Sequence, residues 1–183
     1  SYHTLLTELH EVAGNRIPEE GVKVSLRDIF KYTDIKLVRD EITSIDFDEK
    51  ALVSDNNQYK YDHLILSAGS EPNFYDIPGL EENCFTLWSY DDAINIREHI
   101  KQCFIKASQE KDTDTRKKLL RFAVGGGGYT GVEVMGEIGQ WVKKLCRLYE
   151  IPRYEVELIL IEALPNILSN MKEKNITKAT RYL

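Results

Sequence analysis

The stretch RFAVGGGGYTGVEVMGEI, residues 121–138, contains four consecutive glycines and then a fifth at Gly131. Its central part, Gly126 to Gly131, fits the pattern GxGxxG. Residues 121–125 before the motif, RFAVG, predict a strand, and the amphipathic stretch from about 129 to 149 predicts a helix. GxGxxG also occurs by chance in loops, so the flanking segments decide its meaning. Between a strand and a helix, it is typical of a dinucleotide-binding βαβ unit.

Each glycine of this motif has a physical reason. Gly126 allows a tight turn, Gly128 lets the backbone approach a pyrophosphate, and Gly131 lets the helix pack close to the strand. The start of the helix adds unpaired N–H groups and the positive end of its dipole. The predicted dinucleotide contacts are therefore the six residues of the turn, Gly126, Gly127, Gly128, Tyr129, Thr130 and Gly131.

A second strand is predicted at 156–161 and is followed by Glu162, 31 residues after Gly131. An acid in this place binds the hydroxyls of an adenosine ribose and repels the 2′-phosphate of NADP. The usual spacing is about 20 residues after the motif, and a longer helix and loop would explain the difference. The sequence favours NAD over NADP, with a merely solvated Glu162 as the alternative.

Glu133 follows the motif by two residues and invites two interpretations. In the first turn of the helix, a carboxylate is stabilised by the helix dipole by about 0.3 to 1 kcal/mol. A carboxylate beside a pyrophosphate is repelled, however, so it could instead point toward the nicotinamide end of the cofactor. Spacing alone leaves both interpretations open.

The composition is that of an ordinary globular protein, with 42% hydrophobic and 30% charged residues among 183. The net charge of −6 argues against a nucleic-acid partner, which would require clustered Lys and Arg. The apolar runs are shorter than the roughly 20 residues of a membrane span, and the acidic start is unlike a signal peptide. Because the chain begins at Ser1, we expect a piece of a longer protein.

Cysteine and histidine spacing predicts no metal site. Cys84, Cys103 and Cys146 match neither a zinc pattern nor CxxC, and they are interpreted as unlinked thiols of an intracellular protein. His3 and His10 lie seven residues apart without a third ligand, so we interpret them as surface or packing residues.

The remaining sequence predicts mixed α/β structure. Two short helices are expected within 1–31, a strand meander from Ile35 to about 60, and a buried parallel strand in HLILSAG, 63–69. Ser89 is expected to cap a helix, and the hydrophilic run 109–118 is the expected domain boundary.

Five segments in order resemble one family. They are RDEITSIDFDEKALV, YDHLILSAGSEP, FTLWSYDDAINIREHI, the glycine stretch itself and VELILIEALPNIL. Together they are similar to the type II NADH dehydrogenases, single-subunit flavoenzymes of the pyridine nucleotide-disulfide oxidoreductase superfamily. The resemblance covers nearly the whole chain. It implies an α/β fold, a partial three-layer Rossmann-like FAD/NAD(P)-binding fold with a small antiparallel β meander.

The resemblance also implies domains and cofactor contacts. Residues 1–85 would belong to an FAD-binding domain, 86–115 to a connecting helix and linker, and 116–183 to the start of an NADH-binding domain. The glycine motif and Glu162 would hold NADH, and Glu133 would lie near the nicotinamide and flavin. The implied FAD contacts are Ile42, Ser67, Ala68 and Gly69. The family more often has Ala-Thr-Gly at 67–69, so Ala68 lacks a threonine hydroxyl.

The implied activity is hydride transfer from NADH to FAD, followed by electron transfer to a quinone. The absence of a CxxxxC pair fits this acceptor, because disulfide reductases of the superfamily need that pair. The implied protein is cytoplasmic and peripheral on the inner face of the cell membrane through parts outside this chain, with a homodimer as a further expectation. The alternatives are a soluble flavoprotein reductase with another acceptor and a non-catalytic NADH-binding module.

Overall fold

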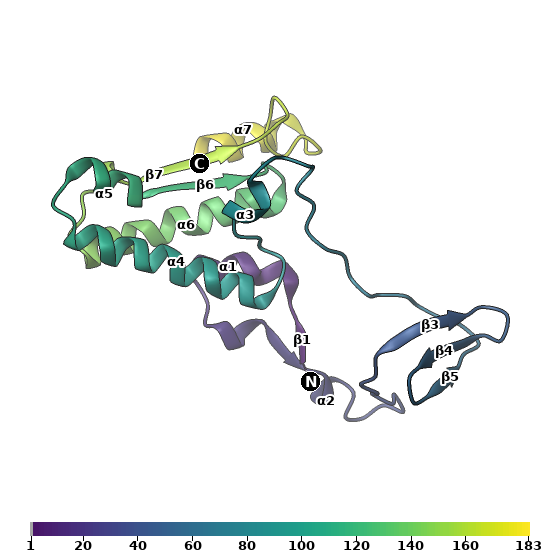
Figure 1. Cartoon of the computed structure of the whole chain (residues 1–183). Helices are drawn as coiled ribbons and strands as arrows, with labels where there is room; N and C mark the ends of the chain where they lie inside the picture. The colour runs from purple at the N-terminus through teal and green to yellow at the C-terminus, as the bar shows by residue number, and fades with distance from the viewer. Residues whose placement is uncertain (1) are drawn as a thin grey trace. The chain divides into compact units, whose positions relative to one another are not determined.

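The computed structural model describes residues 2–183, which form two compact units (Figure 1). The larger unit joins the N-terminal residues up to Leu26 to Pro72–Leu183. The smaller unit is Arg27–Glu71.

The larger unit contains a parallel βαβ arrangement. Strand β6 (Arg121–Gly125) pairs with β7 (Glu157–Ile161), and α6 (Tyr129–Leu148) and the short helix η3 (Arg153–Glu155) connect them. The predicted strand, helix and strand are confirmed. In the register, Arg121 faces Glu157 and Gly125 faces Ile161, so both strands end at the same edge. The glycine turn and Glu162 therefore leave the sheet side by side.

Helix α6 is buried over a wide face. Met135, Ile138, Val142 and Leu145 are buried, whereas Leu148 is 69% exposed. The other buried side chains of α6 are Val134, Trp141 and Cys146. The face is wide because α6 contacts both helices and the sheet.

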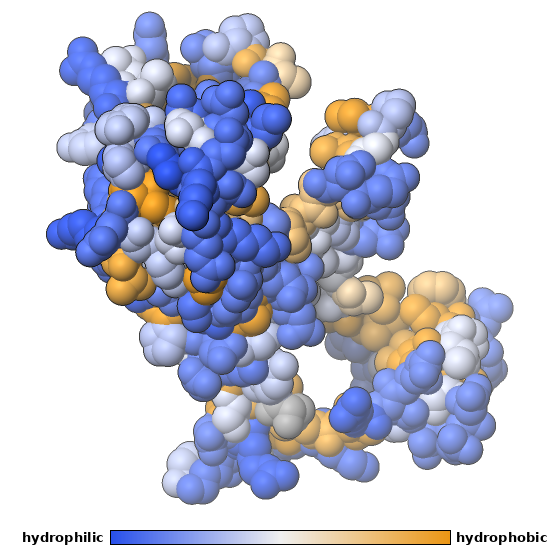
Figure 2. Space-filling model, turned by 60° about the vertical axis from the view of Figure 1, so that its left-hand side comes forward, coloured by the Kyte–Doolittle hydropathy of each residue, from blue (hydrophilic) through white to orange (hydrophobic). Residues whose placement is uncertain are grey.

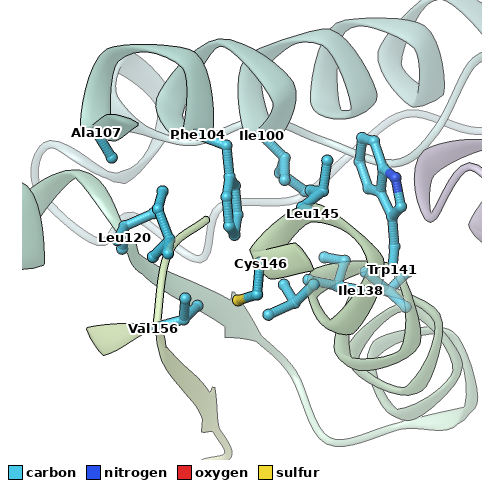
Figure 3. Packing of buried hydrophobic residues seen from close by; sticks show 12 residues of the cluster. Ile100, Phe104, Ala107, Leu120, Ile138, Trp141, Leu145, Cys146 and Val156 are labelled. Atoms are coloured by element: carbon cyan, nitrogen blue, oxygen red, sulfur yellow. The ribbon is translucent and has the colours of Figure 1, made fainter. Parts of the chain in front are cut away.

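Helix α4 (Tyr90–Gln109) supplies the partner layer of the core. Ser89 caps it, since its hydroxyl accepts from the Asp92 amide while the Asp92 carboxylate accepts from the Ser89 amide. Burial raises the pKa of Asp92, but the hydrogen bonds that its carboxylate accepts, first from the Ser89 and Trp88 amides, outweigh burial and lower the pKa overall. Figure 3 shows Phe104 of α4 pointing into the cluster, with Leu145 and Cys146 of α6 close by.

The hydrophilic run after α4 folds into α5 (Thr113–Leu119). Arg116 of this helix makes two hydrogen bonds to the carboxylate of Glu155, whose side chain is almost fully buried. The ion pair raises the pKa of Arg116 and supplies a partner for a buried charge. The domain boundary predicted in this run stays a prediction.

The N-terminal segment packs on the two long helices. It contains η1 (Leu6–Glu8), α1 (Leu9–Ala13) and η2 (Glu19–Val22), and it pairs β1 (Tyr2–Thr4) with β2 (Lys23–Ser25). Helix α1 contacts both α4 and α6. At Gly14 an added Cβ would lie 2.4 Å from the Glu137 Cβ, so α1 ends almost in backbone contact with α6.

Only part of the predicted N-terminal secondary structure forms. The first predicted helix is present as α1, but the second is a single turn, α2 (Leu26–Ile29), after β2. The larger unit also contains the short helix α3 (Leu80–Asn83) and α7 (Glu173–Tyr182). Within residues 2–183, no helix is both long enough and apolar enough to span a bilayer.

The smaller unit is the predicted meander. Strands β3 (Ile42–Asp46), β4 (Ala51–Ser54) and β5 (Gln58–Lys60) pair antiparallel in sequence order. The Asp40 carboxylate ties the strands by accepting hydrogen bonds from Tyr59, Ser54 and Asn57. These bonds, with that of Tyr59 the strongest, lower the pKa of Asp40 to about 2.

The prediction of a buried parallel strand at 63–69 is wrong for this chain. These residues form no strand, and Ile65 and Leu66 are 89% and 64% exposed. A strand needs a neighbour to satisfy its N–H and C=O groups, and no strand in residues 2–183 pairs with this run. Ile35 and Leu37 likewise lie outside the strands. Figure 2 shows hydrophobic surface gathered on the meander unit, where Phe47 is 70% exposed.

Replacing Phe104 by Ala should destabilise the larger unit by about 3–5 kcal/mol, because the fully buried ring would leave a cavity. Urea unfolding of the full-length protein, followed by circular dichroism, measures this. Phe47→Ala is the matched control, since its ring is largely exposed. Equal losses in both variants would contradict the assignment of the core.

Candidate functional site

The glycine turn joins β6 to α6 in a conformation that depends on two of its glycines. Gly126 has φ +99°, a value that side chains rarely tolerate, and its N–H donates to the Ile161 carbonyl at 2.8 Å. At Gly131 an added Cβ would lie 1.8 Å from the Gly126 carbonyl oxygen. The tight turn at Gly126 and the close packing at Gly131 are thus confirmed.

The middle of the turn is open and rich in donors. An added Cβ at Gly128 would meet nothing within 4 Å, and Gly128 caps α6 without a side-chain hydrogen bond. The first four N–H groups of a helix have no intrahelical partner. The start of α6 therefore offers backbone donors and positive dipole charge to an anion.

Glu162 folds back onto this turn. One carboxylate oxygen accepts the Gly127 amide at 2.6 Å, and the other accepts the Leu164 amide at 2.8 Å. The Leu164 and Gly127 amides lower the pKa of Glu162, so the group is charged at neutral pH. A carboxylate has about four acceptor positions, which leaves room for further donors such as ribose hydroxyls. Glu162 is thus held at the turn rather than merely solvated.

Sequence reasoning missed that Gly127 is the buried residue of the turn. Its carbonyl accepts the Leu168 amide at 2.7 Å. An added Cβ would lie 2.9 Å from both the Glu162 carboxylate and the Ile167 side chain. The segment after β7 therefore packs on the turn. Sequence spacing alone does not predict this contact.

Glu133 lies outside the first turn of α6. It is the fifth residue of the helix, and the first turn contains no acid. Because the dipole effect falls off within the first turn, the dipole interpretation loses its main support. The Glu133 side chain is 51% exposed and faces the His10 ring, with Oε2 3.8 Å from Nδ1.

A cavity of about 680 Å³ lies between the N-terminal segment and the start of α6. Its lining residues are Leu6, Thr7, Glu8, Leu9, His10, Glu11, Leu87, Trp88, Tyr129, Thr130 and Glu133. Tyr129 and Thr130 of the motif thus share a hollow with Glu133. His10, interpreted from sequence as a surface or packing residue, lines it with only 13% of its side chain exposed.

The residues expected near FAD belong to the smaller unit. Ile42 begins β3 and is 40% exposed, while Ser67 and Ala68 lie in the exposed run after the meander. Gly69 has φ +82° with nothing within 4 Å of an added Cβ. The backbone at Gly69 is therefore open to a flat ligand.

The sequence profile of the family described as "Pyridine nucleotide-disulphide oxidoreductase" matches residues 6–183. The chain belongs to this family. Within the family it is similar to the type II NADH:quinone oxidoreductases of Staphylococcus haemolyticus, at 28% identity, and of Staphylococcus aureus, at 30%. All of this chain is matched in both cases, and it spans 45% of the length of each relative.

Two solved structures have a fold similar to that of this chain. NDH2 of Plasmodium falciparum, solved in complex with RYL-552, matches with a TM-score of 0.83 at 24% identity, over 96% of this chain and 38% of that one. A putidaredoxin reductase in a covalent complex with putidaredoxin matches with a TM-score of 0.65 at 20% identity, over 100% of this chain and 38% of that one. The predicted Rossmann-like FAD/NAD(P)-binding fold, partial in this chain, is confirmed.

Gly131→Ala should destabilise the protein by about 2–4 kcal/mol, because its methyl group would collide with the Gly126 carbonyl. Gly128→Ala is the matched control and should cost less than about 1 kcal/mol, since its methyl group would enter open space. Thermal unfolding of both variants measures the difference. Similar losses in the two variants would contradict the close packing at Gly131.

Proposed function

We propose that this chain is the NADH-binding and part of the FAD-binding region of an FAD-dependent NADH:quinone oxidoreductase. The observation that carries the proposal is the glycine turn with the charged Glu162 carboxylate hydrogen-bonded to it. An open anion site and a ribose-binding acid side by side suit a dinucleotide. The names of the staphylococcal relatives support the choice of NADH and quinone.

The turn residues suit the pyrophosphate of NADH and the ribose next to it. Gly128 leaves space for close approach, and the amides at the start of α6 donate to phosphate oxygens. Tyr129 and Thr130 lie at the same helix start, exposed to the cavity. Glu162 would accept the ribose hydroxyls on its free lone pairs.

We assign Glu133 to the nicotinamide end of this site. It lies one turn beyond the anion-binding amides and faces the cavity rather than the turn. A carboxylate in that place can orient a nicotinamide and offset the charge that develops on it. Hydride transfer between nicotinamide and flavin is the chemistry that the two cofactors supply when bound.

The remaining parts of the proposal concern the longer protein. Ile42, Ser67, Ala68 and Gly69 would contact FAD. The domains would be 1–85 for FAD, 86–115 for the connection and 116–183 for NADH. The protein would act on a membrane quinone from the cytoplasmic side, as a peripheral protein and a homodimer.

The visible spectrum of the full-length protein tests this function. A flavin band that is bleached by NADH under anaerobic conditions and restored by a soluble quinone analogue is the expected result. Bleaching by NADH without reoxidation by the quinone would favour a reductase with another acceptor. Colourless protein that binds NADH would favour a non-catalytic NADH-binding module.

Glu162→Gln should narrow the preference for NADH over NADPH by about tenfold, because the charge that repels the 2′-phosphate is removed. The ratio of kcat/KM for the two nucleotides measures this. Glu157→Gln is the matched control, because Glu157 lies at the opposite end of β7 and pairs with Arg121. An unchanged ratio in Glu162→Gln would contradict the ribose assignment.

A further inference from the structure

His10 and Glu133 lie next to each other although their elements are far apart in the sequence. The imidazole comes from α1 and the carboxylate from α6, with 3.8 Å between Nδ1 and Oε2. The His10 side chain is mostly buried, whereas that of Glu133 is half exposed toward the cavity. His10 and Glu133 both line the cavity, so a ligand there would meet the carboxylate with this imidazole next to it.

The position of His10 is rigidly determined by its helix. Leu9, Val12 and Ala13 of α1 are buried in a small core with Ala93 of α4. The close approach of Gly14 to Glu137 holds the other end of α1 against α6. The backbone that carries His10 is therefore held in place beside α6.

Other charged groups surround His10. The carboxylate oxygens of Glu8 and Glu11 and a ring nitrogen of His10 lie within 4.8 Å of one another. Glu11 also pairs with Arg16 at 3.4 Å, and Arg16 is bound at 2.7 Å to Glu137 of α6.

From α4, Arg97 approaches the N-terminal segment, but its partners are Glu19 and Glu98. The Arg97 guanidinium is therefore already paired with carboxylates. Around His10 the charged groups are mainly carboxylates.

We propose that His10 is a positioning residue that orients Glu133 and, when protonated, offsets its charge, so that pH controls how strongly the site holds NAD⁺. This inference rests on the proposed function, because it requires Glu133 beside the nicotinamide. The nicotinamide ring is positively charged in NAD⁺ and neutral in NADH. An uncompensated Glu133 carboxylate therefore strengthens the binding of NAD⁺ relative to NADH. A carboxylate paired with an imidazolium strengthens it less.

The direction in which the affinity for NAD⁺ changes with pH follows from the charge of the imidazole. Histidine changes charge between about pH 5 and 8. At the acid end the imidazolium offsets Glu133 and NAD⁺ binds more weakly. At the alkaline end the neutral imidazole leaves the carboxylate uncompensated and NAD⁺ binds more tightly. NADH affinity should change little, because its ring is uncharged.

The test is the Kd of NAD⁺ for the oxidised full-length holoprotein between pH 5.5 and 8. In the unmodified protein, Kd should fall about three- to tenfold across this range. His10→Asn keeps an amide near the position of Nδ1 but cannot be protonated. It should bind NAD⁺ tightly at every pH, with a flat profile.

Glu133→Gln tests the same pair from the other side and keeps the inference falsifiable if His10→Asn does not fold. It should bind NAD⁺ weakly, again with a flat profile, and the double variant should match it. His3→Gln is the control for a histidine change, because His3 is exposed on β1. It should retain the profile of the unmodified protein.

Two outcomes separate this inference from the function on which it rests. If His10→Asn or Glu133→Gln keeps the pH dependence of the unmodified protein, the inference is overturned and the proposed function stands. If the unmodified holoprotein binds neither NADH nor NAD⁺, both are overturned together.

Discussion

The contact between Gly131 and the carbonyl oxygen of Gly126 determines where α6 starts and how close it lies to β6. No side chain fits between these residues, so the helix begins directly above the end of the strand. Its unpaired amides consequently open at the edge where β6 and β7 both end. The start of α6 and the place where its amides open both depend on this close approach.

Glu162 gives the turn its second constraint. By accepting the Gly127 and Leu164 amides, its carboxylate joins the loop before α6 to the loop after β7. The same hydrogen bonds favour the ionised form, so a structural contact also maintains the charge that a ribose-binding acid needs. Under the proposed function, the same side chain would both stabilise the turn and select the nucleotide.

The packing behind the turn relates it to the N-terminal segment. Helix α6 is buried against α4 and the sheet, and α1 contacts both long helices. Through α1, His10 reaches Glu133, which lies one turn beyond the amides. The cavity is thus lined by residues of the N-terminal segment and of the start of α6, and a mostly buried imidazole lies beside its Glu133 carboxylate.

The sequence by itself determined the βαβ unit, the glycine turn and the acid at the end of β7. These features rest on local rules, namely strand and helix periodicity and the conformational freedom of glycine at Gly126. The cap at Ser89 was predictable for the same reason, since a capping box is contained in four successive residues.

Only the tertiary structure decided the partners of these residues. Nothing in the spacing placed His10 beside Glu133, because the pair depends on how α1 packs across α6. Burial of Trp141 and Cys146 likewise depends on neighbours from distant segments. The apolar run at 63–69 is the converse case, where a strand pattern forms no strand because pairing requires a second strand, and none in residues 2–183 lies beside it.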